Sequence, residues 1–142
     1  DDATFVKLDS LIARHGLEDH VEVTGRIPET ELLDIMRSAD VLVHLSRIDS
    51  YPLVVLEALA LSTFPVCMEL AGARDMVERY AGHVVPIDRA IESTTAFLGS
   101  VDIGRLRRAA DEAALQVRDD YSWTYCGAAL EGSLNLTAAT RL

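Results

Sequence analysis

Blocks of apolar residues with two different spacings alternate along this chain. Apolar positions three or four residues apart predict a helix from about Thr4 to His15, and Gly16 is a natural end for it. The same spacing predicts further helices at 28–36, 53–61, from the turn at Gly72 to about Tyr80, at 87–98 and 104–119, and from Ser122 onward. Short runs between them predict strands at 21–25, 41–45, 64–68 and 82–86.

The predicted strands at 41–45 and 64–68 are apolar almost throughout, which is typical of strands buried on both faces of a parallel sheet. Because helices and strands alternate, we expect an α/β fold: a Rossmann-like parallel sheet of about four strands with helices on both faces. No repeat, linker or low-complexity stretch interrupts residues 1–142, which therefore predict a single domain. The weakly patterned tail after about residue 135 is expected to fray.

Composition narrows the possible partners of this domain. The chain of 142 residues has a net charge of −10, which argues against binding nucleic acid or an anionic membrane over a wide surface. No run of 18 apolar residues predicts a membrane span. Cys67 and Cys126 belong to no CxxC pair, so we expect two reduced thiols, no zinc site and a cytoplasmic protein.

The loop Arg47–Pro52 follows a predicted strand and opens a predicted helix, where open parallel sheets bind ligands. Pro52 suits the first helical position, and the free amides at the start of the helix 53–61 would form an anion site. Asp49 could cap this helix or face a ligand. Glu57 lies about one turn in, among Leu, Val and Ala, where a buried carboxylate would need partners such as ligand hydroxyls.

Several segments in order resemble one family. They are LEDHVEVTGRIPETELLDIMRSADVLVHLS, DSYPLVVLEALA, FPVCMELAGARDMV, GHVVP and YSW. Together they resemble the C-terminal, nucleotide-sugar-binding half of a GT-B glycosyltransferase of the large retaining family 4, the glycosyl transferases group 1. The resemblance runs from about Leu17 to Trp123, and it implies half of a GT-B fold.

The resemblance implies a transferase that moves a sugar from a nucleotide-diphosphate sugar to a glycan, lipid or small-molecule acceptor, with retention of configuration, in polysaccharide biosynthesis. It implies no cofactor and no metal. Glu57 would accept hydrogen bonds from the ribose hydroxyls, and Asp49 would face the donor sugar; these are the implied catalytic residues. The implied substrate-binding positions are Ser50, Tyr51, Pro52 and Leu53 for sugar hydroxyls and phosphate, Gly25, Arg26 and Ile27 for the nucleobase, and Asp75 near the phosphates or as a helix cap.

Three departures from the family pattern bear on activity. Asp49 stands where the family has glutamate, and Ser50 stands where glycine is usual. The family's first strands, its basic loop and its N-terminal acceptor domain precede the segment seen here. We therefore expect a fragment that is inactive alone and, when full-length, cytoplasmic or peripheral at a membrane. The strand at 21–25 would pair directly with 41–45, or the gap would be filled by missing chain or by a second copy through an exposed sheet edge.

Two other functions remain open at this stage: a GT-B epimerase of nucleotide sugars, and a non-catalytic or decayed nucleotide-sugar-binding module. Three further features have simpler interpretations. His44 is read as a core histidine with a backbone partner, and Trp123 as a packing anchor. The arginines at 105, 107 and 108 are read as a solvated helix face with i,i+4 pairs.

Overall fold

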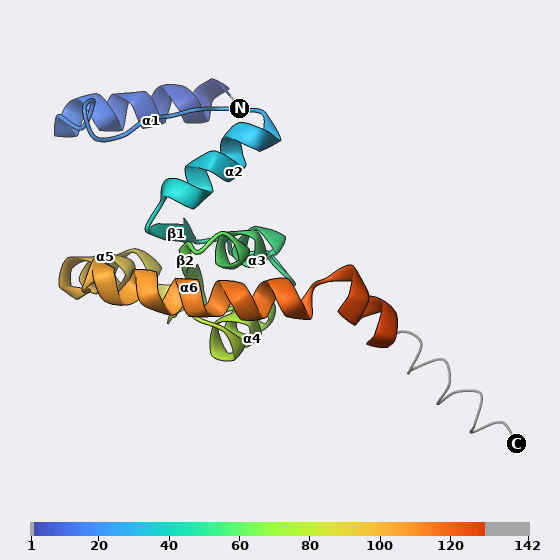
Figure 1. Cartoon of the computed structure of the whole chain (residues 1–142). Coiled ribbons are helices and arrows are strands. Elements are labelled where there is room, and N and C mark those ends of the chain that lie inside the picture. Colours follow the sequence, from blue (N-terminus) through green and yellow to red (C-terminus); the bar gives the residue numbers. More distant parts are fainter. Residues whose placement is uncertain (1, 130–142) are drawn as a thin grey trace, which may run out of the picture. The chain divides into compact units, whose positions relative to one another are not determined.

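The computed structural model describes residues 2–129, which form two compact units divided between Leu32 and Leu33 (Figure 1). The first unit holds α1 (Asp2–His15), and Gly16 follows it with a φ of 63°. This end of the helix agrees with the sequence prediction, because glycine adopts the left-handed conformation without a steric penalty.

The predicted strand at 21–25 is wrong. These residues have no regular secondary structure, and no strand of the described chain pairs with them. Val21 and Val23, the apolar positions of the predicted alternation, are exposed. A strand needs a neighbouring strand to receive its backbone hydrogen bonds, so an alternating sequence without such a neighbour stays irregular. Direct pairing of 21–25 with the strand at 41–44 is therefore also wrong.

The helix α2 (Glu29–Ser38) spans the division between the units. It begins directly after Pro28, whose carbonyl accepts a hydrogen bond from the Leu32 amide at 3.0 Å. Glu29 and Glu31 lie in its first turn, where their negative charges interact favourably with the positive end of the helix dipole and stabilise the helix. The structure thus confirms the predicted position of this helix.

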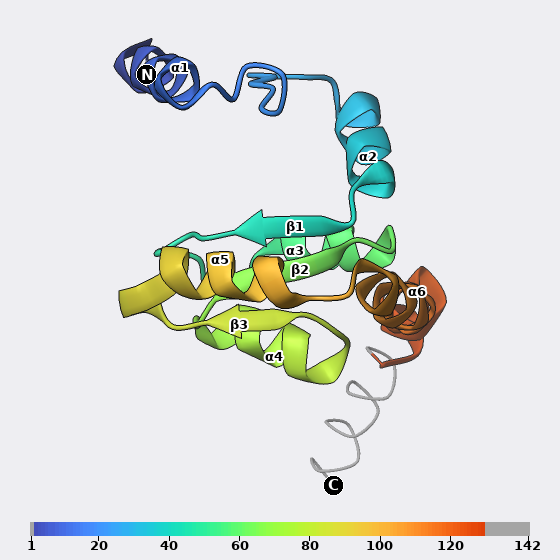
Figure 2. The ribbon, with the colours of Figure 1, turned by 90° about the vertical axis from the view of Figure 1, so that its left-hand side faces the viewer.

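The second unit contains a parallel sheet of three strands, rather than about four, in the order β1-β2-β3 (Figure 2). The strands are β1 (Val41–His44), β2 (Phe64–Met68) and β3 (His83–Val85). All five residues of the central β2 are buried, as predicted. The outer strand β1 is only partly covered, and Val43 is 45% exposed. The expectation that β1 is buried on both faces is therefore wrong, because α5, the helix on the face that Val43 occupies, packs mainly against β3 at the other side of the sheet.

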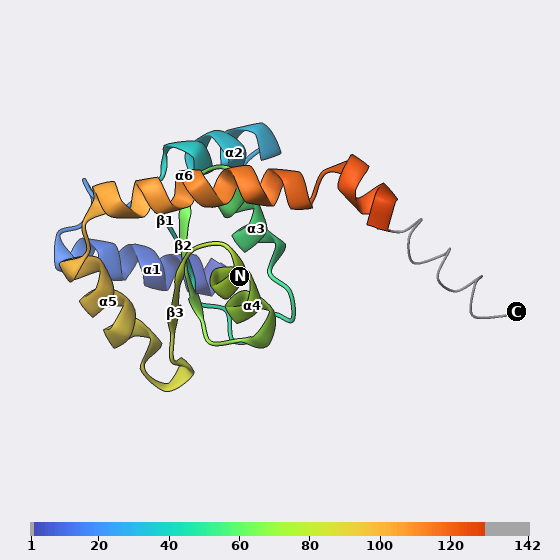
Figure 3. The same cartoon turned by 60° about the horizontal axis from the view of Figure 1, so that its bottom comes forward.

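Helices cover both faces of this sheet, as predicted (Figure 2). They are α3 (Leu53–Ala60), α4 (Ala71–Arg79), the short 3₁₀ helix η1 (Ile87–Arg89), α5 (Ala90–Ser100) and α6 (Ile103–Asp120). Cys67 of β2 packs with α3 and α4 in one core cluster, whereas Phe64, Val66 and Met68 pack with α5 in the other. This alternation follows the two-residue period of the strand. The helix α6 contributes to both clusters and runs along α3 (Figure 3).

The predicted last helix is confirmed for residues 123–129, but its predicted anchor is wrong. Trp123 is 94% exposed. The apolar stripe of α6 ends with Val117 in the core, and the chain then turns at Tyr121 before the next helix begins. The tail after residue 135 lies outside the described residues. Within the part that is described, no helix is long and apolar enough to cross a membrane.

Candidate functional site

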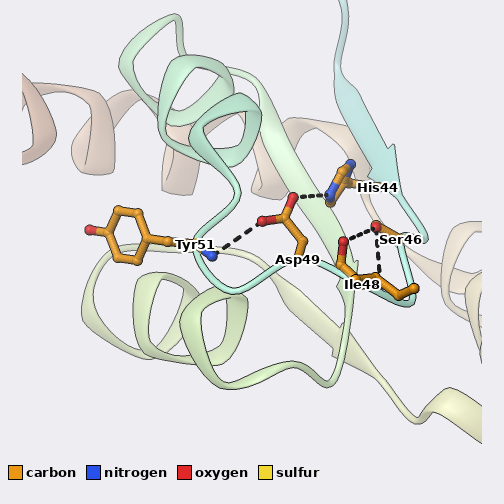
Figure 4. Close-up of polar contacts among 5 residues, drawn as sticks. All are labelled: His44, Ser46, Ile48, Asp49 and Tyr51. Atoms are coloured by element: carbon orange, nitrogen blue, oxygen red, sulfur yellow. Dashed lines mark hydrogen bonds and ion pairs between the residues drawn. The ribbon is translucent and has the colours of Figure 1, made fainter.

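The three parallel strands end at one edge of the sheet, and the loop from Leu45 to Pro52 leaves β1 at this edge and leads into α3. Hydrogen bonds between side chains and the backbone hold this loop in a folded-back conformation (Figure 4). The Ser46 hydroxyl lies 3.4 Å from the Ile48 amide and 3.3 Å from its carbonyl oxygen. These contacts close a short turn, so the loop has a defined local structure before any ligand arrives.

Asp49 is held at both carboxylate oxygens. Its Oδ1 accepts a hydrogen bond from the Tyr51 amide at 3.2 Å, and its Oδ2 lies 3.4 Å from Nε2 of His44 (Figure 4). Asp49 therefore shapes the loop and does not cap α3, whose N-cap residue is Pro52 with no side-chain hydrogen bond. The prediction that His44 is a core histidine with a backbone partner is wrong as well. Its side chain lies at the end of the strand, and the polar group nearest to its Nε2 atom is the Asp49 carboxylate.

The start of α3 presents two free amides, one fewer than expected. Pro52 occupies the N-cap with a φ of −72°, so the helix begins one residue later, at Leu53. The Val55 amide donates to the Pro52 carbonyl at 3.0 Å. Within the described chain, the amides of Leu53 and Val54 donate no hydrogen bond. Both point out of the helix start, where the dipole favours negative charge.

Gly72, in the first turn of α4, lies directly against this loop. A β-carbon at this position would stand 2.1 Å from the Ser50 carbonyl oxygen and 3.1 Å from the Tyr51 Cα. Only a residue without a side chain can occupy this place while the loop keeps its conformation. The small-residue turn in the sequence indicated a bend here, but it did not indicate which segment the glycine faces.

Glu57 lies on the exposed side of α3, so the burial that its apolar neighbours suggested does not occur. It lines a groove of about 390 Å³ between α3 and α6. The residues of this α3–α6 groove are Leu53, Leu56, Glu57, Ala60, Val117, Arg118 and Tyr121. Arg118 donates to the Ala60 carbonyl at 2.7 Å, and within the described chain the Glu57 carboxylate has no hydrogen bond or ion pair.

The loop is tied to the end of α6 through two tyrosines. The hydroxyls of Tyr51 and Tyr121 form a hydrogen bond. This hydrogen bond is the largest cause, and burial the second, of a rise in the pKa of Tyr51 to about 12. The Tyr80 hydroxyl donates to Asp120 at 2.8 Å, and Arg79 pairs with the same carboxylate oxygen at 2.8 Å. These contacts join the loop, α4 and the end of α6.

Asp75 does not cap α4, because the N-cap is Leu70 and Asp75 lies one turn further into the helix. It is exposed, and its negative charge contributes to the raised pKa of Tyr51, after the Tyr121 hydrogen bond and burial. Among the predicted residues, the structure thus brings Asp75 and the 49–53 segment into one neighbourhood. Glu57 lies one helical turn after Leu53 on α3.

The predicted nucleobase turn lies in the first unit, residues 1–32. Gly25 has a φ of 62° with open space around it, which confirms a turn. Arg26 is exposed and Ile27 is partly buried. The contact of these residues with a base stays a prediction.

A second hollow, of about 400 Å³, lies at the carboxyl edge of the sheet. Its lining includes Leu45, Arg47, Met68, Ile87 and Arg89, and it does not include Asp49 or Glu57. Arg47 is exposed and has no ion-pair partner among the residues that the structure describes. Across those same residues, no group of three or more His, Cys, Asp or Glu side chains could hold a metal ion.

Comparison with known proteins identifies the family. The family model "Glycosyl transferases group 1" matches residues 1–115, which is most of the chain and includes the loop after β1, α3 and α4. No curated protein matches the chain. The parallel α/β sheet agrees with the Rossmann-like half of a GT-B fold that the sequence resemblance implied. The chain therefore belongs to the glycosyl transferases group 1.

Proposed function

We propose that this chain binds the nucleotide-diphosphate sugar of a retaining glycosyltransferase, which transfers the sugar to a glycan, a lipid or a small molecule. Glycosyl transfer is the activity of the family; the donor-binding role and retention are the added proposal. One observation carries it. The unbonded amides of Leu53 and Val54 open α3 between two acidic residues, Asp49 in the loop and Glu57 one turn along.

The amides suit the diphosphate. Two N–H groups at a helix start, together with the helix dipole, favour an anion without any side-chain charge. Arg47, in the same loop, exposes a guanidinium that can add a charged hydrogen bond. As the bond to the sugar breaks, negative charge grows on the leaving diphosphate, and donors fixed in advance stabilise that charge. The proposed mechanism therefore needs no metal.

Glu57 suits the ribose. On a helix the Cα–Cβ bond tilts toward the N-terminus, so the side chain of Glu57 leans over the first turn of α3, where the free amides lie. Leu53, four residues earlier, lines the same α3–α6 groove. A carboxylate has room for several acceptor contacts, so it can take two neighbouring hydroxyls at once. The ribose is joined directly to the diphosphate, which fits a spacing of one helical turn.

The remaining assignments follow the family resemblance. Asp49 faces the donor sugar, and the backbone from Ser50 to Leu53 holds sugar hydroxyls and the distal phosphate. Asp75, which lies near Tyr51, is assigned to the phosphate end of the donor. The turn at 25–27 is assigned to the base.

Calorimetric titration with UDP, GDP and ADP tests the proposal. We expect one of the three to bind and Glu57→Ala to remove that binding. Glu112→Ala is the matched control, since Glu112 is an exposed glutamate on α6 whose carboxylate has no hydrogen bond or ion pair within the described chain. If none of the three nucleotides binds, the donor-binding proposal fails and the non-catalytic module takes its place. Equal loss in both variants would also contradict the role of Glu57.

A further inference from the structure

We infer that His44 is a positioning residue that fixes the direction of the Asp49 carboxylate at the carboxyl edge of the sheet. This rests on the proposed function only in so far as Asp49 faces the donor sugar. The contact between the two side chains is a property of the loop itself.

The position of His44 at the end of β1 brings its ring close to the Asp49 carboxylate. His44 is the last residue of β1 and is paired in register with Cys67 of β2, so its backbone is held by the sheet. Its Nε2 atom is buried and has no hydrogen bond of ordinary geometry, yet it lies 3.4 Å from Asp49 Oδ2. A buried ring nitrogen needs a polar partner, and the carboxylate is the one the structure provides.

The contact differs from the two short turns within the loop because it connects Asp49 to the strand that precedes the loop. The Ser46–Ile48 and Asp49–Tyr51 contacts link residues two apart within the loop. The His44–Asp49 contact connects the loop to a strand (Figure 4). It therefore links the direction of the Asp49 carboxylate to the sheet, whereas the Tyr51–Tyr121 and Ser50–Gly72 contacts hold other parts of the loop.

Asp49 keeps the capacity to bind a ligand while it is held. Its side chain is 29% exposed, and each carboxylate oxygen can accept a further hydrogen bond. An aspartate side chain is one methylene shorter than the glutamate that the family usually has at this position. The Asp49 carboxylate can therefore reach fewer positions of a sugar hydroxyl. A ring fixed on the strand compensates by holding the short carboxylate in one direction, which lowers the entropy lost on binding.

Three variants test this role. His44→Gln keeps an N–H donor, His44→Leu removes it, and Asp49→Ala removes its partner. The first measurement needs no ligand: hydrogen exchange of the Tyr51 amide, which donates to Asp49 Oδ1. We expect exchange to rise about fivefold in His44→Leu, because the carboxylate that accepts this amide is no longer held toward the strand, and to stay within about twofold of wild type in His44→Gln.

The second measurement is affinity for the glucose conjugate of whichever of UDP, GDP and ADP binds best, because only the conjugate carries the sugar that Asp49 faces. We expect about a fivefold loss in His44→Leu and recovery in His44→Gln. In an Asp49→Ala background, His44→Leu should cause no further loss, because the ring acts through the carboxylate. An equal loss with and without Asp49 would show a merely structural role and overturn the inference.

The outcomes separate this inference from the proposed function. If no nucleotide or nucleotide sugar binds the wild type, the donor-binding proposal fails, and the Tyr51 exchange alone decides the role of His44. Unchanged exchange in His44→Leu overturns the inference even when nucleotide binds normally.

Discussion

Gly72 and Ser50 lie so close that a β-carbon on the glycine would stand 2.1 Å from the serine carbonyl oxygen. The first turn of α4 therefore supports the loop that joins β1 to α3. Because this contact is made by backbone atoms, the neighbour cannot move aside as a flexible side chain would. The conformation of the 49–52 segment thus depends on the absence of a side chain 22 positions further along the chain.

Substituting Gly72 should distort this loop. We expect Gly72→Ala to destabilise the fold by about 1–3 kcal/mol, since overpacking forces backbone shifts, and to weaken nucleotide binding. Gly99→Ala is the control, because Gly99 also lies in a helix but has nothing within 4 Å of an added β-carbon. That change should stabilise by roughly 0.5–1 kcal/mol. Urea unfolding of both variants measures the contrast, and equal effects would argue against the close contact.

The Tyr51–Tyr121 hydrogen bond predicts a loss of stability at high pH. A tyrosine whose pKa is raised to about 12 in the folded state, against about 10 in the unfolded chain, favours folding below pH 10. This contribution is lost as the pH rises from 10 toward 12. In Tyr121→Phe the pKa of Tyr51 should fall toward its ordinary value, which ultraviolet titration detects. If Tyr51 still titrates near pH 12 in this variant, the two hydroxyls do not interact.

The two cysteines should differ sharply in reactivity. Cys67 is buried in the centre of β2, and burial raises the pKa of its thiol to about 11, so little reactive thiolate forms at pH 8. Cys126 is exposed. Iodoacetamide at pH 8 should therefore label one site in the native protein, and Cys126→Ser should abolish that label. Mass spectrometry counts the labels, and two labels appearing at similar rates would contradict the burial of Cys67.

Burial also separates Leu59 from Trp123. Leu59, on the buried face of α3, is fully buried, and Leu59→Ala should cost about 2–5 kcal/mol through lost packing and a residual cavity. Trp123 is 94% exposed, so Trp123→Ala should change stability by less than about 0.5 kcal/mol. Trp123 is the single tryptophan of the chain, and its fluorescence emission should match that of free tryptophan in water. A blue-shifted emission would place it in an apolar contact.

The purified chain of 142 residues should bind a nucleotide sugar without turning it over. Transfer needs an acceptor as well as a donor, and this assay supplies none, so donor binding alone does not complete the reaction. Incubation with UDP-, GDP- and ADP-glucose, followed by chromatography for released nucleotide, measures this. Sustained release above a Glu57→Ala control would contradict the expectation.

Much of the fold follows from local patterns in the sequence. Apolar spacing predicted the helix α1, which ends at His15 before Gly16, and the all-apolar run of β2 indicated a central buried strand. The ordered motifs pointed to the family that the comparison confirmed. These features depend on residues near one another in the chain, and periodicity records them directly.

Contacts between distant segments were decided only by the tertiary structure. The alternating residues 21–25 resemble a strand, yet a strand exists only where a partner takes its hydrogen bonds. Glu57 among leucines suggested burial, but the helix turns it outward, and Trp123 extends beyond the stripe that packs. The His44–Asp49 contact forms because the loop after β1 folds back toward the end of that strand. Sequence spacing determines which face of an element a residue occupies, whereas packing decides what that face meets.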